Sequence, residues 1–273
     1  MHRSTFFIML TALVLGGLID VPSLRGRDHD GQFSFDEYLL APVRVHLLSA
    51  RAWTALQTTL AEKDITRILG KVNGIWAQAG IHFYLESLVR EEAVTPENNV
   101  PGGGVRTRFT MLDLRPAQSK ATNLLHLYYV KEMSMNGICF PEAIFVKDTA
   151  TLNAVPGGID EPIPRVTSHE LGHAFSLSHR QDNTNLMASG TTGTGLNEVE
   201  IGQAREAALK LGWIESANEL MKRADALFRA NQEQTAADLY SRLATIPVKA
   251  EQVESARKRA TPSTRTNPGS ATE

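Results

Sequence analysis

Residues 169–187 read HELGHAFSLSHRQDNTNLM, and this stretch decides what fold and chemistry the rest of the chain must support. On a helix, positions four apart lie on one face, so His169 and His173 can present both imidazoles to one ion. Imidazole nitrogens bind Zn²⁺ at about 2.0–2.1 Å. Glu170 lies between them in the sequence and is placed to take a proton from a water in the open coordination position. The stretch therefore predicts zinc-dependent hydrolysis of an amide bond.

A catalytic zinc needs a third protein ligand, and His179 follows His173 at a suitable spacing. Further on, Met187 ends the run NTNLM. The pattern HExxHxxSxxH with a downstream methionine turn resembles metzincin-type zinc metallopeptidases. The resemblance implies that His169, His173 and His179 bind zinc, that Glu170 is the general base, and that Met187 lies in the turn beneath the metal.

The chain departs from this family pattern at Ser176, where the family has glycine. The glycine lets the backbone leave the helix at positive φ, so that the third histidine returns to the metal. A serine in that conformation costs on the order of 1–2 kcal/mol, and zinc binding contributes several-fold more. The departure therefore bears on the geometry of the site more than on metal binding itself.

A glutamate is the alternative third ligand, as in thermolysin-like enzymes, and Glu198 and Glu200 lie downstream in LNEVE. Both also fit the start of a helix over residues 197–211. In that interpretation Asn197 is the N-cap and Glu200 completes a capping box.

The N-terminal segment, residues 1–23, has the pattern of an export signal. His2 and Arg3 precede about fourteen apolar or small residues, a run shorter than the about 20 residues that span a membrane. Cleavage after Ser23 predicts a secreted or periplasmic protein, and a membrane attachment only if the segment is not cleaved.

Composition excludes other classes of function. Apolar residues make up 42% of the chain and the formal net charge is −2, which indicates a globular protein and gives no sign of a nucleic-acid partner. The single cysteine, Cys139, cannot form an intramolecular disulfide and is expected to be a buried structural thiol.

A second pattern lies in the short polar segment 24–41, where GRDHDGQFSFDEY resembles an EF-hand calcium loop. With Gly31 at the glycine position, the calcium ligands would be Asp28, Asp30, Ser34 and Glu37. The first ligand position is Gly26 instead of aspartate, which weakens any such site. The alternative is a polar, turn-rich segment that binds no ion.

The resemblance covers residues 42–213 and implies an α+β fold, in which a twisted mixed sheet packs on an active-site helix and a small lower subdomain follows. The residue pattern agrees: strands begin at 42, 81, 124 and 136, and an amphipathic helix over 61–79 ends at Gly80. Residues 91–122 read as loop. The loop at 188–195 is expected to line the pocket for the residue after the scissile bond. We expect three further histidines to have packing roles: His46, His82 and His126.

Residues 214–260 have helical spacing around a polar turn and resemble a single tetratricopeptide-like hairpin. One such repeat cannot bury its own apolar face, so it should pack on the catalytic domain or on a protein partner. Residues 261–273 read as a disordered tail.

Three functions remain open at this point. The first is an exported zinc endopeptidase that acts on peptide or protein substrates. The second is a zinc-binding but proteolytically inactive relative, in which Ser176 has relaxed the site and the helical extension binds a partner. The third is a calcium-dependent surface or binding module.

Overall fold

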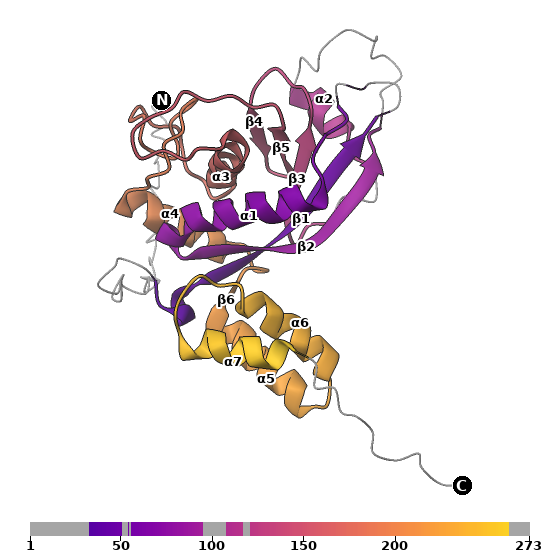
Figure 1. The fold of residues 1–273 in the computed structure, drawn as a ribbon, viewed down its shortest axis with the longest axis vertical. Coiled ribbons are helices and arrows are strands. Elements are labelled where there is room, and N and C mark those ends of the chain that lie inside the picture. The colour runs from indigo at the N-terminus through magenta and orange to yellow at the C-terminus, as the bar shows by residue number, and fades with distance from the viewer. Residues whose placement is uncertain (1–32, 51–53, 55, 95–107, 117–120, 262–273) are drawn as a thin grey trace, which may run out of the picture.

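The computed structural model describes residues 33–50, 54, 56–94, 108–116 and 121–261 (Figure 1). Its elements, in chain order, are η1 (Phe35–Glu37), β1 (Leu39–Ser49), α1 (Glu62–Trp76), η2 (Ala77–Ala79), β2 (Ile81–Glu92), α2 (Arg108–Asp113), β3 (Leu125–Val130), β4 (Gly137–Phe140), β5 (Ala143–Lys147), α3 (Pro162–Ala174), α4 (Glu198–Lys210), β6 (Glu215–Ser216), α5 (Ala217–Arg229), α6 (Glu233–Leu243) and α7 (Glu251–Ala260).

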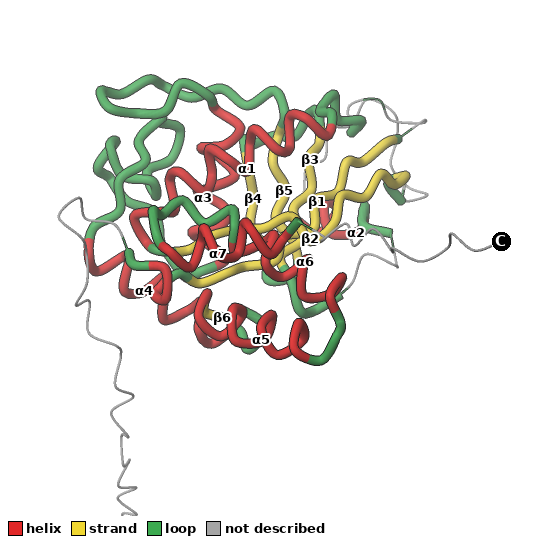
Figure 2. The backbone as a smooth tube through the Cα atoms, turned by 60° about the horizontal axis from the view of Figure 1, so that its bottom comes forward, coloured by secondary structure: helices red, strands yellow, loops and turns green. Residues whose placement is uncertain are grey.

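The centre of the fold is a mixed sheet with strand order β2-β1-β3-β5-β4 (Figure 2). β1, β2, β3 and β5 are parallel, whereas β4 pairs antiparallel with β5 at the edge. The short β6 pairs antiparallel with the first two residues of β1, before the residues of β1 that pair with β3. The predicted α+β class with a mixed sheet is therefore confirmed. None of the described helices is both long enough and apolar enough to cross a membrane.

Two helices, α1 and α3, pack together on one face of the sheet. The apolar positions of α1 that recur at three and four are all buried: Ile65, Ile68, Leu69, Val72, Ile75 and Trp76. The side chain of Asp64 accepts a hydrogen bond from the Ala61 N–H at 2.9 Å and so caps the first turn. Gly80 ends the helical segment at φ 59°, as its position predicts. This packing places α3, and with it the three-histidine motif, against β5 and the antiparallel edge strand β4.

The structure differs from the sequence-based boundaries in three places. β1 begins at Leu39, before the expected Pro42, because Leu39 and Leu40 pair with β2 on one side and β6 on the other. The short helix α2 lies within a stretch predicted to be loop, and Met111 packs in a second core on the opposite face of the sheet. Residues 214–260, predicted to form a two-helix hairpin, hold a third helix, α7, as well.

The C-terminal helices pack against the rest of the chain near the start of β1 (Figure 1). The Ala217 N–H donates to the Tyr38 carbonyl at 2.8 Å, and the guanidinium of Arg242 lies over the Tyr84 ring at 4.7 Å. The apolar face that a single hairpin leaves open is thus covered by the sheet domain and by α7. Binding of a further protein by these helices stays a prediction.

Two of the strand histidines lie within the sheet and contact each other. His46 Nε2 is 2.9 Å from His126 Nδ1, and His46 Nδ1 is 2.6 Å from a carboxylate oxygen of Glu91. The ring of Tyr128 stacks on His46 at 4.1 Å. Both histidines are buried, in agreement with the predicted packing role.

His82 connects β2 to the C-terminal helices, because its Nε2 lies 2.8 Å from Thr245 Oγ1 while its Nδ1 has no hydrogen-bond partner. Burial lowers the pKa of His82 to about 4. The folded chain therefore binds fewer protons at this site than the unfolded chain between about pH 4 and pH 6.5, and stability falls as the pH drops through that window.

We expect His82→Gln to reduce this acid sensitivity. Between pH 7.5 and pH 4.5 the unfolding free energy of the parent should fall by about 2–3 kcal/mol more than that of the variant. Urea denaturation of both proteins at the two pH values measures this difference. Equal losses in both proteins would show that His82 does not titrate in the folded state as inferred.

Candidate metal centre

The three histidines of the motif converge on one point. His173 Nε2 lies 3.2 Å from His169 Nε2 and 3.1 Å from His179 Nε2, and the three nitrogens all lie within 4.8 Å of one another. Two nitrogens bound to one tetrahedral ion at about 2.1 Å are about 3.4 Å apart. Within the described ranges this is the one group of histidine, cysteine and acidic side chains whose ligand atoms converge in this way.

The tautomers of two of these rings are set by main-chain carbonyls. His169 Nδ1 lies 2.8 Å from the Leu186 carbonyl, and His173 Nδ1 lies 2.8 Å from the Leu177 carbonyl. Each Nδ1 must donate its proton there, which leaves the Nε2 lone pairs directed toward the common point. Lone pairs at this separation repel one another unless a cation lies among them. The donor set therefore fits a zinc ion.

The lowered pKa values of the buried His169 and His173 rings also favour metal binding. Burial lowers the pKa of His169 to about 3, against the smaller effect of its hydrogen bond to Leu186. Burial also lowers the pKa of His173. Both rings are therefore neutral at physiological pH, which is the form that binds metal.

The turn at Ser176 brings His179 to the cluster. Ser176 has φ 64°, the left-handed conformation for which the family uses glycine. The Leu177 N–H donates to the Gly172 carbonyl and the Ser176 N–H donates to the His173 carbonyl, both at 2.9 Å. These two bonds form a Schellman motif. Helix α3 thus ends with the geometry that the resemblance implies, in spite of the serine.

Met187 lies beneath the histidines, fully buried, as the resemblance implies. A Cβ atom added to Gly172, which is between His169 and His173 on α3, would come within 2.5 Å of the Met187 sulfur. The glycine thus lets the methionine turn approach the back of the helix.

Arg165 fastens this methionine turn to α3. Its buried guanidinium donates to the carbonyls of Gly193 at 2.9 Å, Asn185 at 3.2 Å and Ala188 at 2.6 Å. Burial lowers the pKa of Arg165 to about 10, so the side chain stays charged at neutral pH. A single buried cation therefore sets the path of the loop that carries Met187.

Neither alternative third ligand joins the cluster. Glu198 is exposed in the first turn of α4. Glu200 is fully buried, and its carboxylate accepts hydrogen bonds from Arg180 at 2.5 Å and from the Asn185 side chain at 2.8 Å. Glu200 also caps α4 by accepting from the Asn197 N–H at 2.9 Å. Glu200 therefore connects Arg180, the residue after His179, to the methionine turn. Within that turn, the Asn185 side chain accepts a hydrogen bond from the Met187 N–H at 2.7 Å.

Glu170 lies next to the histidines in a cavity of about 270 Å³, which His169 and His179 also line. Ser189 and Gly190 of the predicted pocket loop line it as well. Burial raises the pKa of Glu170 to about 8, and the charge of Arg165 opposes that rise. A bound cation would oppose it further. Glu170 thus lines the same cavity as two of the three histidines whose nitrogens converge.

Sequence reasoning missed three residues that shape this centre: Gly137, Arg165 and Asn185. A Cβ on Gly137, the first residue of β4, would lie 2.6 Å from a Glu170 carboxylate oxygen. A glycine inside a strand often marks such a close approach, so a signal was present. Arg165 lies one helical turn before His169, and a charged residue on that buried face was the corresponding signal.

Of the predicted calcium ligands, the structure describes Ser34 and Glu37, and these two bond to each other. Glu37 accepts hydrogen bonds from the Ser34 N–H at 3.0 Å and the Ser34 hydroxyl at 2.6 Å, which makes the pair a local cap of η1. Asp28 and Asp30 lie outside the described residues. Cys139, expected to be buried, is only half-buried.

Comparison with known proteins gives distant similarities in structure alone. No protein-family model matches the chain, and no curated protein matches it either. Archaemetzincin from Methanopyrus kandleri is similar at 15% identity and TM-score 0.36, over 64% of this chain and 94% of that chain. Metalloproteinase-II from Bacteroides fragilis is similar at 10% identity and TM-score 0.38, over 64% of this chain and 54% of that chain. A zinc-dependent peptidase from Methanocorpusculum labreanum is similar at 14% identity and TM-score 0.31, over 62% of this chain and 99% of that chain.

We expect Ser176→Gly to stabilise the metal-free chain by about 0.5–1 kcal/mol, because glycine adopts positive φ without the Cβ clash while it also gains freedom in the unfolded state. Ser176→Ala is the matched control, since it removes the hydroxyl and keeps the Cβ. Urea denaturation in the presence of a chelator measures both. A glycine variant no more stable than the alanine variant would contradict the inferred strain.

We expect Glu200→Gln to weaken zinc binding about tenfold, because the turn that carries His179 loses its charged anchor to Arg180. Glu198→Gln, at an exposed position on the same helix, should bind zinc as the parent does. Competition with a chromophoric chelator gives the three affinities. Equal affinities for all three proteins would remove Glu200 from the support of the site, and a loss confined to Glu198→Gln would reassign the third ligand.

Proposed function

We propose that the chain is a zinc-dependent endopeptidase, which hydrolyses peptide bonds in an extended stretch of a peptide or protein. The observation that carries the proposal is the convergence of three imidazole Nε2 atoms within 4.8 Å, with Glu170 lining the same cavity as His169 and His179. When bound by these histidines, zinc would supply Lewis-acid chemistry, polarising the substrate carbonyl and lowering the pKa of a bound water to about 7.

Glu170 is the proton-transfer group in this proposal. Its carboxylate takes a proton from the attacking water and later delivers it to the leaving amine nitrogen. Burial and the opposing charge of Arg165 act on its pKa in opposite directions, which suits a group that must both accept and release a proton near neutral pH. The contact with Gly137 limits where the carboxylate can move.

The substrate is proposed to bind as an added strand. β4 pairs with β5 on one side and is the last strand of the described sheet, so an extended peptide would add at its other edge, where no described strand pairs. Main-chain hydrogen bonds to this edge would provide affinity that does not depend on the substrate sequence. Two cavities with no shared lining residue, one lined by His173 and the other by His169 and His179, support cleavage within a chain over removal of a terminal residue.

The turn at Ser176 favours an active enzyme over a zinc-binding protein without activity. The inactive alternative supposes that the serine has relaxed the site. The backbone at Ser176 adopts the left-handed turn, and His179 lies 3.1 Å from His173. The calcium-dependent module gains no support, since Ser34 and Glu37 bond to each other.

Export is part of the proposal and is supported by the apolar run near the N-terminus. N-terminal sequencing of the protein recovered from the producing cells tests it. Cleavage near Ser23 is expected, and an intact Met1 on cell-internal protein would contradict it.

We expect Glu170→Gln to retain zinc and lose cleavage of casein by roughly 10²–10⁴-fold, because the amide cannot accept the proton of the attacking water. His179→Ala should lose both zinc and activity, and the exposed variant Glu198→Gln is the matched control that should keep both. Metal analysis and a casein assay on each purified protein provide the measurements. Parent-like cleavage by Glu170→Gln would refute the mechanism.

A further inference from the structure

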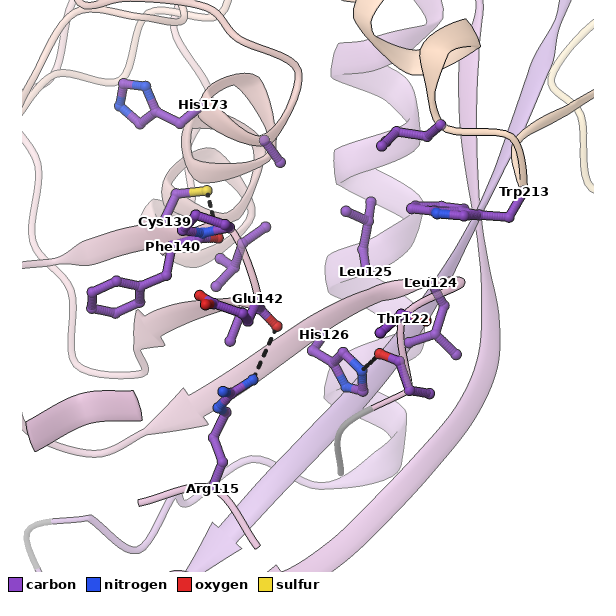
Figure 3. Close-up of a pocket in the computed structure, with 16 residues that line it drawn as sticks. Arg115, Thr122, Leu124, Leu125, His126, Cys139, Phe140, Glu142, His173 and Trp213 are labelled. Carbon is purple, nitrogen blue, oxygen red and sulfur yellow. Dashed lines mark hydrogen bonds between the residues drawn. The ribbon is translucent and has the colours of Figure 1, made fainter. Parts of the chain in front are cut away.

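A second and larger cavity, of about 550 Å³, lies beside the metal centre (Figure 3). His173 lines it, and so does Ala174 at the end of α3. It shares no lining residue with the cavity that holds Glu170. One histidine of the cluster thus lines a cavity separate from the one that holds Glu170, and the proposed function assigns no ligand to it.

The cavity arises from a step in the sheet. On one side of β1, β3 pairs with Val43–Leu47 whereas β6 pairs with Leu39 and Leu40. Between these two pairings no described strand lies beside β1 on that side. Leu125 at the start of β3 and Trp213 just before β6 both line the cavity, and Figure 3 shows Trp213 across from Cys139 and Phe140. The connection to the C-terminal helices therefore forms one wall.

The walls are mainly apolar, formed by Leu124, Leu125, Phe140, Ile144, Leu211 and Trp213. Two of the polar lining residues, Arg115 and His126, are already engaged by the protein, and Thr122, Glu142 and His173 also line the cavity. Arg115 donates to the carbonyls of Leu112 at 3.3 Å and Glu142 at 3.2 Å. His126 contacts the Ala121 carbonyl at 2.8 Å through Nε2 and His46 through Nδ1. A ligand that fills this space therefore meets carbon surface more than unpaired polar groups.

The direction of β4 assigns the cavity to one side of the scissile bond. β4 runs from Gly137, in the cavity of Glu170, to Phe140, in the larger cavity. A peptide that adds antiparallel to β4, as β5 does on the other edge, runs from the larger cavity to the smaller one. The larger cavity then receives a residue on the amino-terminal side of the bond that is cut.

We propose that this cavity is a specificity pocket for a large apolar side chain, aromatic or leucine-like, within the three residues before the scissile bond. The inference rests on the proposed peptidase function. A volume of about 550 Å³ accommodates the largest side chains. Replacing such a residue with alanine in the substrate should reduce kcat/KM by roughly 10- to 200-fold.

The test uses a mixed-sequence peptide library, with cleavage sites read by mass spectrometry for the zinc-loaded protein. Phenylalanine, leucine, tyrosine, tryptophan or methionine should be enriched at one of the three positions before the cut. Ala174→Leu, which places a side chain in the cavity, should shift that preference toward alanine and glycine and reduce kcat/KM on a phenylalanine peptide at least tenfold. Trp213→Ala, which removes one wall, should weaken the preference.

Glu198→Gln is the control, because Glu198 is exposed and lines neither cavity, and it should keep the parent's preference on both sides of the cut. Zinc content confirms that each variant keeps the metal centre. Cleavage that depends on Glu170 but shows no preference before the cut, or a preference that Ala174→Leu leaves unchanged, overturns the pocket and leaves the peptidase intact. A library with no cleavage that depends on Glu170 overturns the proposed function and this inference together.

Discussion

At Ser176 the backbone leaves helix α3 through a left-handed turn. The orientation of His173 and the position of His179 both depend on that turn. It places the Leu177 carbonyl where it accepts from His173 Nδ1, which sets the tautomer of that ring. It also returns the chain so that His179 lies 3.1 Å from His173. A local backbone conformation, which serine adopts at some cost, thus decides both the orientation of one ligand and the presence of another.

Three buried polar side chains, Glu200, Asn185 and Arg165, hold the segments around the histidines in place. Glu200 holds the segment after His179 through Arg180, and Asn185 links the same carboxylate to the methionine turn. Arg165 joins that turn to the helix that carries the first two histidines. Carboxylate, amide and guanidinium are each buried and each hydrogen-bonded, and the guanidinium of Arg165 bonds to main-chain carbonyls.

The sequence predicted those parts of the site that depend on spacing along one stretch of chain. The His169 and His173 pair, the αL turn at Ser176, the capping of α4 by Asn197 and Glu200, and the helix end at Gly80 all follow from local rules. Gly137 and Asn185 escaped prediction because their roles depend on contacts with residues distant in the sequence. The start of β1 was missed for the same reason, since β6 defines it from the far end of the chain.

The pairing of β6 with β1 also has a consequence for how the chain folds. β1 is the first strand to be synthesised among the described residues. Its last partner, Glu215–Ser216, is made only after the other strands of the sheet, both helices on its face and the stretch that carries the three histidines. Such a non-local contact is slow to form and requires the closure of a long loop. The larger cavity, walled by Trp213, therefore takes shape late. A nascent chain can fold its histidine cluster before it forms the cavity that we propose to select the substrate.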